Sequence, residues 1–522
     1  MRSAPFFFLA LTACAGDPSK TTATSTAGDL EGADSGPPET GDSGDGTDGF
    51  TPEPACGDGT PLSELTTAGC VSEAACSFHG SAAYDYLGYS ADGGQDFDGD
   101  GVDDIVLGAL FSDAIPEADV LYDAGKVVVL SGADLSAGGP GAIASFPGQT
   151  AGEQSGASVS LVGDLDGDGD SELLIGARAY SDGLRSGLGA VHLVMGGAGD
   201  ADGQLVAAST WTGSQVYSRA GHAVLGPGDL DGDGIPELAV GGDLWEAMGA
   251  EETEVFSRGR TFVASGAAVP DSSLLTDFPV HLEGIGTADQ AGAALAAGDL
   301  DGDGHRDLVV GAPYGGSSRG RVYVVPGGAT FFDISVAELD GVASQMIDGT
   351  AVGDAFGWAV AVGELTGDGQ PDLVVGAPLH DAPWDAEGQV VVYAGGAPAE
   401  APFAVLTGEF DDHQLGTGLV AGADLDGDEQ GDLVVGAVAA WHELRPKSGR
   451  TYLLSGGPEL ALVDDISQVP QLHATGAKDF LGRTAAVADV DADGRADLLV
   501  ASAYTNPEGQ TDAGSAWLFY GR

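Results

Sequence analysis

The chain has 522 residues, of which 81 are acidic and only 18 are basic, so its formal net charge is −63. This charge argues against nucleic acids and anionic membrane surfaces as partners. The 87 glycines and the scarcity of basic residues favour a turn-rich, all-β protein, and no apolar run reaches the roughly 18 residues of a membrane span.

The first 13 residues predict a signal peptide. Arg2 supplies a positive charge, residues 4–13 are apolar, and Cys14 follows Leu11-Thr-Ala. This segment resembles a bacterial lipoprotein signal. The resemblance implies cleavage before Cys14, lipidation of that cysteine and, because Ala15 follows it, sorting to the outer membrane. We therefore expect an exported chain, lipid-anchored at the outer membrane or cell surface, that touches the membrane only through this anchor.

Residues 14–70 are expected to form a flexible tether. Between residues 15 and 55 the sequence is rich in Thr, Ser, Gly, Asp and Pro, and such a composition cannot bury enough apolar surface to fold. Three further cysteines follow, Cys56, Cys70 and Cys76. One disulfide with a free thiol is possible in an exported protein, but the sequence does not choose the pair.

From about Val71 the sequence becomes periodic. The clearest unit is Asp164-Leu-Asp-Gly-Asp-Gly-Asp-Ser-Glu172, followed by the apolar run Leu173–Ala177. Carboxylates occupy loop positions 1, 3, 5 and 9, and glycine at position 6 allows the φ > 0 backbone of a tight curl. Hard oxygen donors at this density repel one another unless a cation binds, and the set suits Ca²⁺. The apolar run predicts a buried strand.

This unit occurs seven times, about 65 residues apart, which is typical of a repeat architecture. The predicted metal ligands are Asp96, Asp98, Asp100 and Asp104; Asp164, Asp166, Asp168 and Glu172; Asp229, Asp231, Asp233 and Glu237; Asp299, Asp301, Asp303 and Asp307; Glu364, Thr366, Asp368 and Asp372; Asp424, Asp426, Asp428 and Asp432; Asp489, Asp491, Asp493 and Asp497.

An EF-hand begins with the same letters but requires a bidentate Glu at position 12 and a following helix. Position 12 is apolar in all seven repeats, from Leu107 to Val500, and lies inside the predicted strand. An EF-hand is therefore disfavoured. Position 7 varies from Val102 to Arg495, which indicates that a backbone carbonyl is the ligand there.

Each repeat divides into four short strands. A small-residue strand precedes the acidic loop, the buried run follows it, a third strand opens on glycine, as in Gly320–Val324, and a fourth ends on glycine, as in His281–Gly284. Four strands in each of seven repeats predict a seven-bladed β-propeller. The chain stops after the third strand of repeat seven, so we expect the strand Ala75–Gly80 to complete the last blade and remove its open edge.

Phe356-Gly357 with Gly376-Ala-Pro378, and Gly311-Ala-Pro313 in the preceding repeat, carry a family resemblance. Residues 75–522 resemble the FG-GAP repeats of integrin α subunits, which implies a propeller with Ca²⁺ in the loop between the first two strands of a blade. All seven loops match, giving five to seven structural ions. Repeat five departs through Glu364 and Thr366, and repeat six through Glu429, where glycine is wanted; these loops are expected to bind most weakly.

The variable loops between the second and third strands each carry an aromatic or histidine side chain. The candidates for a ligand-binding face are Phe111, Tyr180, Trp245, Tyr314, His380, Trp384, Trp441 and Tyr504. Rings on one rim can stack on sugars or anchor a protein. The alternative is that they pack between blades.

Three functions are compatible with this organisation. The first is a calcium-stabilised, surface-tethered binding or adhesion module for an extracellular protein or glycan. The second is a structural subunit of an envelope assembly. The third is a propeller enzyme, since some similar propellers resemble polysaccharide lyases or accompany phospholipase domains. The nine histidines are scattered, so we assign no catalytic residue and expect no enzymatic activity.

Overall fold

Residues Met1–Asp48 and Gly49–Arg522 are separate units, and only the second contains described residues. The computed structural model describes residues 50–52, 62, 69–114, 120–139, 141–197, 204–246, 257–271, 273–381, 385–396, 401–441 and 445–521. The predicted signal peptide, Cys14, Cys56 and Trp384 lie outside these residues.

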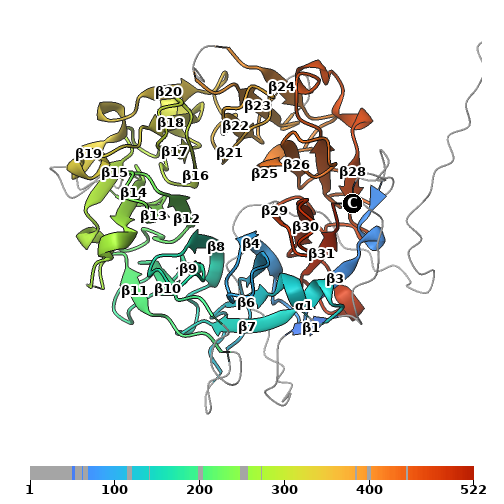
Figure 1. Ribbon diagram of the computed structural model, residues 1–522, viewed down its shortest axis with the longest axis horizontal. Helices are drawn as coiled ribbons and strands as arrows, with labels where there is room; N and C mark the ends of the chain where they lie inside the picture. Colours follow the sequence, from blue (N-terminus) through green and yellow to red (C-terminus); the bar gives the residue numbers. More distant parts are fainter. Residues whose placement is uncertain are drawn as a thin grey trace, which may run out of the picture. The chain divides into compact units, whose positions relative to one another are not determined.

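The second unit is a ring of seven sheets, each built on a four-stranded antiparallel blade (Figure 1), which confirms the predicted propeller. The blades, from the centre outwards, are β4 Leu87–Gln95, β5 Asp104–Ala109, β6 Lys126–Leu130 and β7 Ala142–Pro147; β8 Ser155–Gly163, β9 Glu172–Ala177, β10 Ala190–Val194 and β11 Ser209–Thr212; β12 Ala223–Gly228, β13 Glu237–Gly242, β14 Arg260–Ser265 and β15 Val280–Glu283; β16 Ala294–Gly298, β17 Asp307–Ala312, β18 Arg321–Val325 and β20 Gln345–Asp348; β21 Ala359–Gly363, β22 Asp372–Ala377, β23 Gln389–Tyr393 and β24 Ala404–Thr407; β25 Leu415–Ala423, β26 Asp432–Ala437, β27 Arg450–Leu454 and β28 Gln471–His473; β29 Thr484–Ala488, β30 Asp497–Ser502, β31 Ser515–Phe519 and β3 Cys76–Gly80.

The predicted closure of the ring is confirmed. Strand β3 pairs antiparallel with β31, with Phe78 opposite Ala516, so a strand from the start of the propeller completes the seventh blade. Strand β19 Val336–Glu338 adds to the edge of the third blade. The helices α1 Gly132–Ser136 and α2 Gly315–Ser318 are single turns. Among the described residues no helix is long and apolar enough to cross a bilayer.

Part of the segment predicted as a free tether packs on the propeller. Strand β1 Phe50–Pro52 pairs with β3, and β2 Gly69–Cys70 pairs with β28. The buried Leu62 donates its backbone N–H to Tyr520 O over 3.1 Å. The described positions between 50 and 70 are therefore docked, because they continue the sheet edges of blades six and seven. Cys70 and Cys76 are both disulfide-bonded, and no described cysteine is free.

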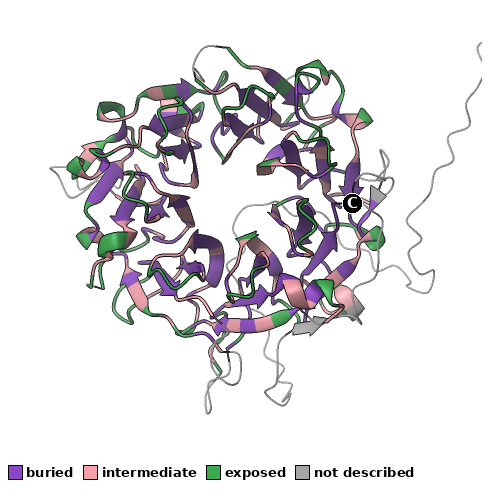
Figure 2. Cartoon of the chain, viewed as in Figure 1, coloured by how far each residue is buried: buried purple, intermediate pink, exposed green. Residues whose placement is uncertain are grey.

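The hydrophobic core lies between neighbouring blades. The second strand of each blade is buried along its whole length, and Figure 2 shows the buried strands inside the ring with exposed residues concentrated in the connections. The cluster around Phe97 and Phe146 joins blades one and two, and that around Leu107 and Leu499 joins blades one and seven. A single blade cannot bury both its faces, so each depends on its neighbours.

Glycines set the distance between adjacent blades. The glycine before each third strand forms an isolated parallel bridge with a residue at, or shortly before, the start of the first strand of the next blade, as in Gly320 with Phe356 and Gly514 with Leu87. A Cβ on Gly320 would lie 2.1 Å from Phe356 O, and its φ is +87°. No other residue fits this approach, which explains why the third strands follow glycine.

Candidate metal centres and the opposite face

The acidic loops connect the first and second strands of each blade and are curled by their own carboxylates. In the third loop, Asp229 Oδ1 accepts the backbone N–H of Gly232 over 2.6 Å, and Asp229 Oδ2 accepts that of Gly234 over 2.9 Å. Asp231 and Asp233 each accept the N–H two residues further on. These bonds gather the carboxylates of positions 1, 3 and 5 on the inside of the loop.

The position 9 acid is buried at the start of the second strand and holds the loop to its blade. Asp307 Oδ2 accepts the N–H of Leu300 over 3.0 Å, and Asp307 Oδ1 accepts that of Gly327, also over 3.0 Å. The same pair of bonds recurs at Asp104, Asp372, Asp432 and Asp497. This acid therefore also has a structural role, which is to hydrogen-bond the loop backbone, and the sequence pattern does not reveal it.

Burial makes the position 9 acids costly to ionise. Desolvation raises the pKa of Glu237 to about 8 and that of Asp104 to about 7, and the neighbouring loop carboxylates add to the rise. Glu237 Oε1 is buried and has no hydrogen-bond partner. A bound cation would supply the missing partner and favour the ionised form, so the residues present fit a metal ion.

Carboxylate oxygens converge in at least five of the seven loops. Oxygens of three acids lie within 4.8 Å of one another in each of the following groups: Asp96, Asp98 and Asp104; Asp164, Asp166 and Asp168; Asp229, Asp231 and Glu237; Asp299, Asp301 and Asp303; Asp424, Asp426 and Asp432. Oxygen-only donor sets of this kind suit hard cations such as Ca²⁺ better than Zn²⁺ or copper.

Three loops depart from the common geometry. Glu364 accepts the N–H of Gly367, and Thr366 Oγ1 turns toward Asp372 over 3.4 Å, so repeat five offers one charge fewer. Glu429 has φ +70°, the strained conformation expected where glycine is replaced. Ala492 in repeat seven, at φ +54°, was not predicted; it replaces the glycine found at position 4 in the other loops.

A second recurring acid was missed by the sequence analysis. It lies three residues before the glycine that opens the first strand, at Asp85, Glu153, Asp289, Asp354 and Asp479. Asp479 accepts the N–H of Gly476 over 2.7 Å, and burial raises its pKa to about 6. These acids cap turns on the face opposite the metal loops. The constant spacing to glycine is the signal that could have identified them.

Comparison with known proteins follows the same repeat boundaries. The FG-GAP repeat model matches residues 87–130, 155–194, 291–325, 356–393 and 481–519. Five of the seven repeats are therefore FG-GAP repeats. The matched segments coincide with blades one, two, four, five and seven.

Proteins similar to this chain include integrin α subunits and a phospholipase. The chain is 30% identical to integrin alpha-PS2 of Drosophila melanogaster over 177 residues, 32% of this chain and 12% of that protein. It is 34% identical to integrin alpha-5 of Xenopus laevis over 195 residues, 37% of this chain and 17% of the other. It is 30% identical to human phosphatidylinositol-glycan-specific phospholipase D over 270 residues, 50% and 31% of the two chains. In each case the chain spans less than a third of the relative.

The predicted ligand-face rings do not form one exposed rim. Trp245 is 1% exposed and packs against Phe262, with ring centroids 4.8 Å apart, so it cannot present its ring to a ligand. His380 is buried beside Asp354. Tyr180 and Tyr314 are half-buried, and Trp441 is exposed. Phe111 and Tyr504 both contact Tyr86, with centroids 5.1 and 5.3 Å away, and form a cluster across blades one and seven.

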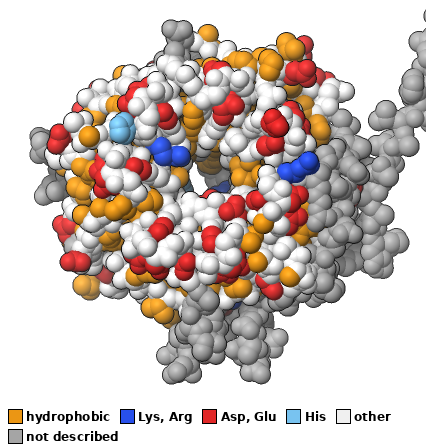
Figure 3. All heavy atoms as spheres, viewed as in Figure 1, with side chains coloured by type: hydrophobic (Ala, Val, Ile, Leu, Met, Phe, Trp, Pro, Cys, Tyr) orange, Lys and Arg blue, Asp and Glu red, His pale blue; other side chains and the backbone are white. Residues whose placement is uncertain are grey.

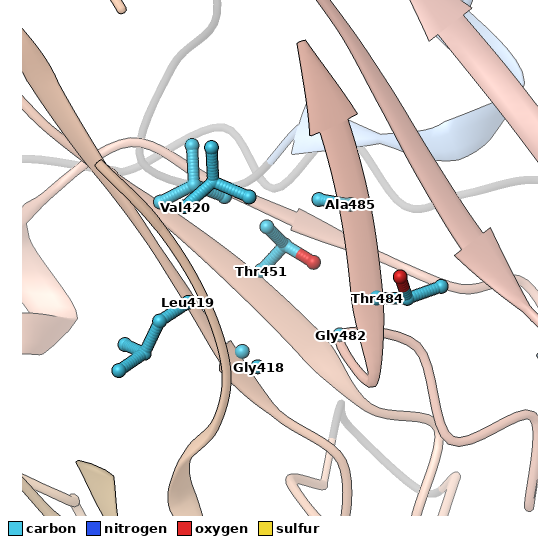
Figure 4. Close-up of a pocket in the computed structure, with 9 residues that line it drawn as sticks. Gly418, Leu419, Val420, Thr451, Gly482, Thr484 and Ala485 are labelled. Carbon is cyan, nitrogen blue, oxygen red and sulfur yellow. The ribbon is translucent and has the colours of Figure 1, made fainter. Parts of the chain in front are cut away.

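Two cavities in the described part of the propeller are small or shallow. One gap between β25 and β29 is lined by Leu419, Val420 and Thr484 (Figure 4), and its volume of about 10 Å³ is near the minimum for a single water. A shallow polar recess of about 210 Å³ lies between the outer strand β24 of blade five and the connection that precedes β28 in blade six. Glu409 and Asp464 are among the residues that line it. Figure 3 shows a central opening on the ring, surrounded by scattered acidic side chains.

Proposed function

We propose that this FG-GAP propeller is a calcium-stabilised binding module that recognises an extracellular protein or glycan through the face opposite the acidic loops. The convergence of carboxylate oxygens in the acidic loops supports this function. The buried position 9 acids support it as well, since Glu237 Oε1 has no hydrogen-bond partner. Asp, Glu, Thr and backbone oxygens would hold the ion. Bound calcium would join the loop carboxylates and fix the loop against the second strand.

Calcium in this role is structural. The loop side chains are directed to the curl itself, and position 9 is bonded to the backbone on both sides. Ligand recognition is therefore assigned to the other ends of the strands, where the variable loops lie and where binding residues usually occur.

The calcium proposal is tested on the full chain. The melting temperature is measured with excess Ca²⁺ and with chelator, and bound ions are counted by native mass spectrometry. We expect a large rise in melting temperature and five to seven bound ions. No rise and no bound metal would contradict the proposal and leave the acidic loops as a charged surface.

We further propose that the chain is exported and anchored by a lipid on Cys14. The segment around Cys14 resembles a bacterial lipoprotein signal. Expression in a bacterial host with labelled palmitate is expected to label the wild-type chain and not Cys14→Ser. Labelling of both variants, or of neither, would contradict the anchor.

A catalytic function is not proposed, although a relative is named as a phospholipase. His79 Nδ1 lies 2.8 Å from Ser515 Oγ, a contact that resembles a nucleophile and its base. However, Ser515 is 1% exposed and faces His79 across paired strands inside blade seven. His192 and Thr210 make the same cross-strand contact in blade two. These pairs stabilise the blades.

A further inference from the structure

Two arginines from different blades converge on one tyrosine. Arg178 Nη1 and Arg483 Nη2 each donate to the phenolic oxygen of Tyr89 over 2.9 Å. The Arg483 guanidinium also lies over the Tyr89 ring, with Cζ 4.3 Å from the ring centroid, and Cζ of Arg178 is 5.3 Å away. The three side chains come from blades seven, one and two.

This cluster lies at the inner end of the blades, on the face opposite the acidic loops. Tyr89 is near the start of β4, which runs to the loop that begins at Asp96. Arg178 directly follows β9, and Arg483 directly precedes β29. Strands β29, β4 and β8 are neighbours around the centre of the ring (Figure 1).

The two guanidinium charges are not neutralised. Neither Arg178 nor Arg483 has a carboxylate within ion-pair distance in the described part of the chain. Arg178 Nε donates instead to the neutral Gln154 Oε1 over 3.0 Å. By contrast, Arg260, Arg321 and other arginines of this chain pair with an acid. In a protein with 81 acidic and 18 basic residues, two adjacent arginines without an acidic partner indicate a site for an anionic ligand.

His222 is a second, independent indication of a ligand. It occupies in blade three the place that Tyr89 and Arg483 occupy in blades one and seven, directly after the glycine of the first strand. Its Nδ1 atom is buried and has no hydrogen-bond partner. Burial, together with the charges of Arg219, Arg178 and Arg483 and against the opposing charge of Asp243, lowers the pKa of His222 to about 4. His222 therefore interacts electrostatically with the same two arginines.

We propose that Arg178, Arg483, Tyr89 and His222 form a binding site for a single oxyanion group, a carboxylate or phosphate carried by a sugar unit of a glycan. Guanidinium groups bind both anions with two parallel N–H bonds. The phenolic O–H and the ring nitrogen of His222 can each make a further hydrogen bond. This inference rests on the proposed binding function of this face and names the chemistry of its ligand.

The charge of the rest of the molecule limits the ligand. The protein has a formal charge of −63, so the parts of a polyanion that extend beyond the two arginines would be repelled. A ligand with one anionic group gains the arginine contacts without this repulsion. A sugar acid and a sugar phosphate are therefore the matching probes, and a neutral sugar is the matching control.

The test uses isothermal titration of the full chain with galacturonate, glucose 1-phosphate and glucose. We expect one of the two anions to bind and glucose not to bind. Arg178→Gln and Arg483→Gln are each expected to weaken binding at least tenfold, whereas Arg185→Gln, which removes an exposed arginine paired with Asp182, leaves it unchanged. The anion that binds identifies the oxyanion.

Binding of neither anion, or binding that survives both arginine substitutions, would overturn the inference. If Arg483→Gln lowers the melting temperature, Arg483→Lys is measured as well. Lysine keeps the positive charge but lacks the two parallel N–H donors, so a loss of oxyanion binding in this variant shows that the donor geometry is needed. If the arginines only tie the blades together, the melting temperature falls in both variants and no anion binds the wild type. The calcium measurement does not depend on these residues, so a stabilising calcium effect without oxyanion binding overturns this inference alone.

Discussion

The guanidinium of Arg483 lies over the ring of Tyr89, 394 residues away in the sequence, at the point where the ring of blades closes. Three kinds of contact close the ring here: a strand pairing, a β-bridge and a side-chain contact. Strand β3 completes blade seven, Gly514 bridges Leu87, and Arg483 contacts Tyr89. The candidate ligand site is therefore built from the two ends of the propeller and requires a closed ring.

Replacing Gly320 with alanine tests the spacing of the blades. The new Cβ would lie 2.1 Å from Phe356 O at φ +87°, so the variant must move the next blade as well as adopt a strained backbone. We expect unfolding free energy to fall by roughly 3 kcal/mol. Gly341→Ala is the control, since nothing lies within 4 Å of its Cβ and its φ is ordinary. Equal urea midpoints for the two variants would contradict the role of this bridge.

Replacing Glu429 with glycine tests the strain in the sixth acidic loop. Glu429 has φ +70°, whereas glycine adopts this conformation freely, so we expect a gain of roughly 0.5 to 1 kcal/mol. Glu459→Gly, at an exposed residue with φ −74°, is expected to lose stability slightly. Urea unfolding in chelator measures both. A loss in Glu429→Gly equal to that of the control would show that the loop is not strained.

Asp307→Asn and Asp303→Asn distinguish two roles of the acids in a metal loop, which are hydrogen bonding to the backbone and binding of calcium. Both oxygens of Asp307 accept backbone N–H groups, and an amide NH₂ in place of one oxygen would leave a buried donor unpaired. We expect a loss of roughly 1 to 3 kcal/mol even in chelator. Asp303 is exposed and is expected to keep the stability in chelator but to bind one calcium ion fewer. If both variants, or neither, lose unfolding free energy in chelator, the two acids do not have these separate roles.

The buried His413 predicts a pH dependence of stability. Its Nδ1 accepts the N–H of Glu409 over 2.9 Å, so the proton resides on Nε2 beside the hydroxyl of Tyr452. Burial, with a smaller effect from Arg450, lowers the pKa of His413 to about 3, well below the ordinary 6.5. Between these values the unfolded chain binds a proton that the native chain does not, so this contribution to stability falls as the pH drops from 7 towards 3.

Comparison with His413→Gln isolates this effect. Burial raises the pKa of Asp85 and of Asp479 to about 6, which acts in the opposite direction, but these acids are common to both proteins. The stability lost by the variant relative to the wild type is therefore expected to be largest at pH 7 and to shrink towards pH 4. A difference that is constant with pH would contradict a neutral His413.

The sequence alone determined the architecture, because the features that specify it are local and repeated. Apolar residues at position 12, from Leu107 to Val500, distinguish a strand from a helix at every loop. The carboxylate spacing predicts the curl, and glycine before the third strand marks the bridge to the next blade. Repeat seven shows three strands in its pattern, and a spare fourth-type strand is predicted at Ala75–Gly80. Pairing of these two sheet edges closes the ring.

Tertiary structure decided what depends on contacts between blades. Whether Trp245 faces solvent or Phe262 depends on the neighbouring strand, and the local pattern is the same in both cases. The docking of β1 and β2 depends on the sheet edges that they meet. Arg178, Tyr89 and Arg483 belong to three repeats, and each looks like an ordinary variation at its position. Only closure of the ring brings their charges together, because Coulomb interactions and hydrogen bonds act through space and not along the chain.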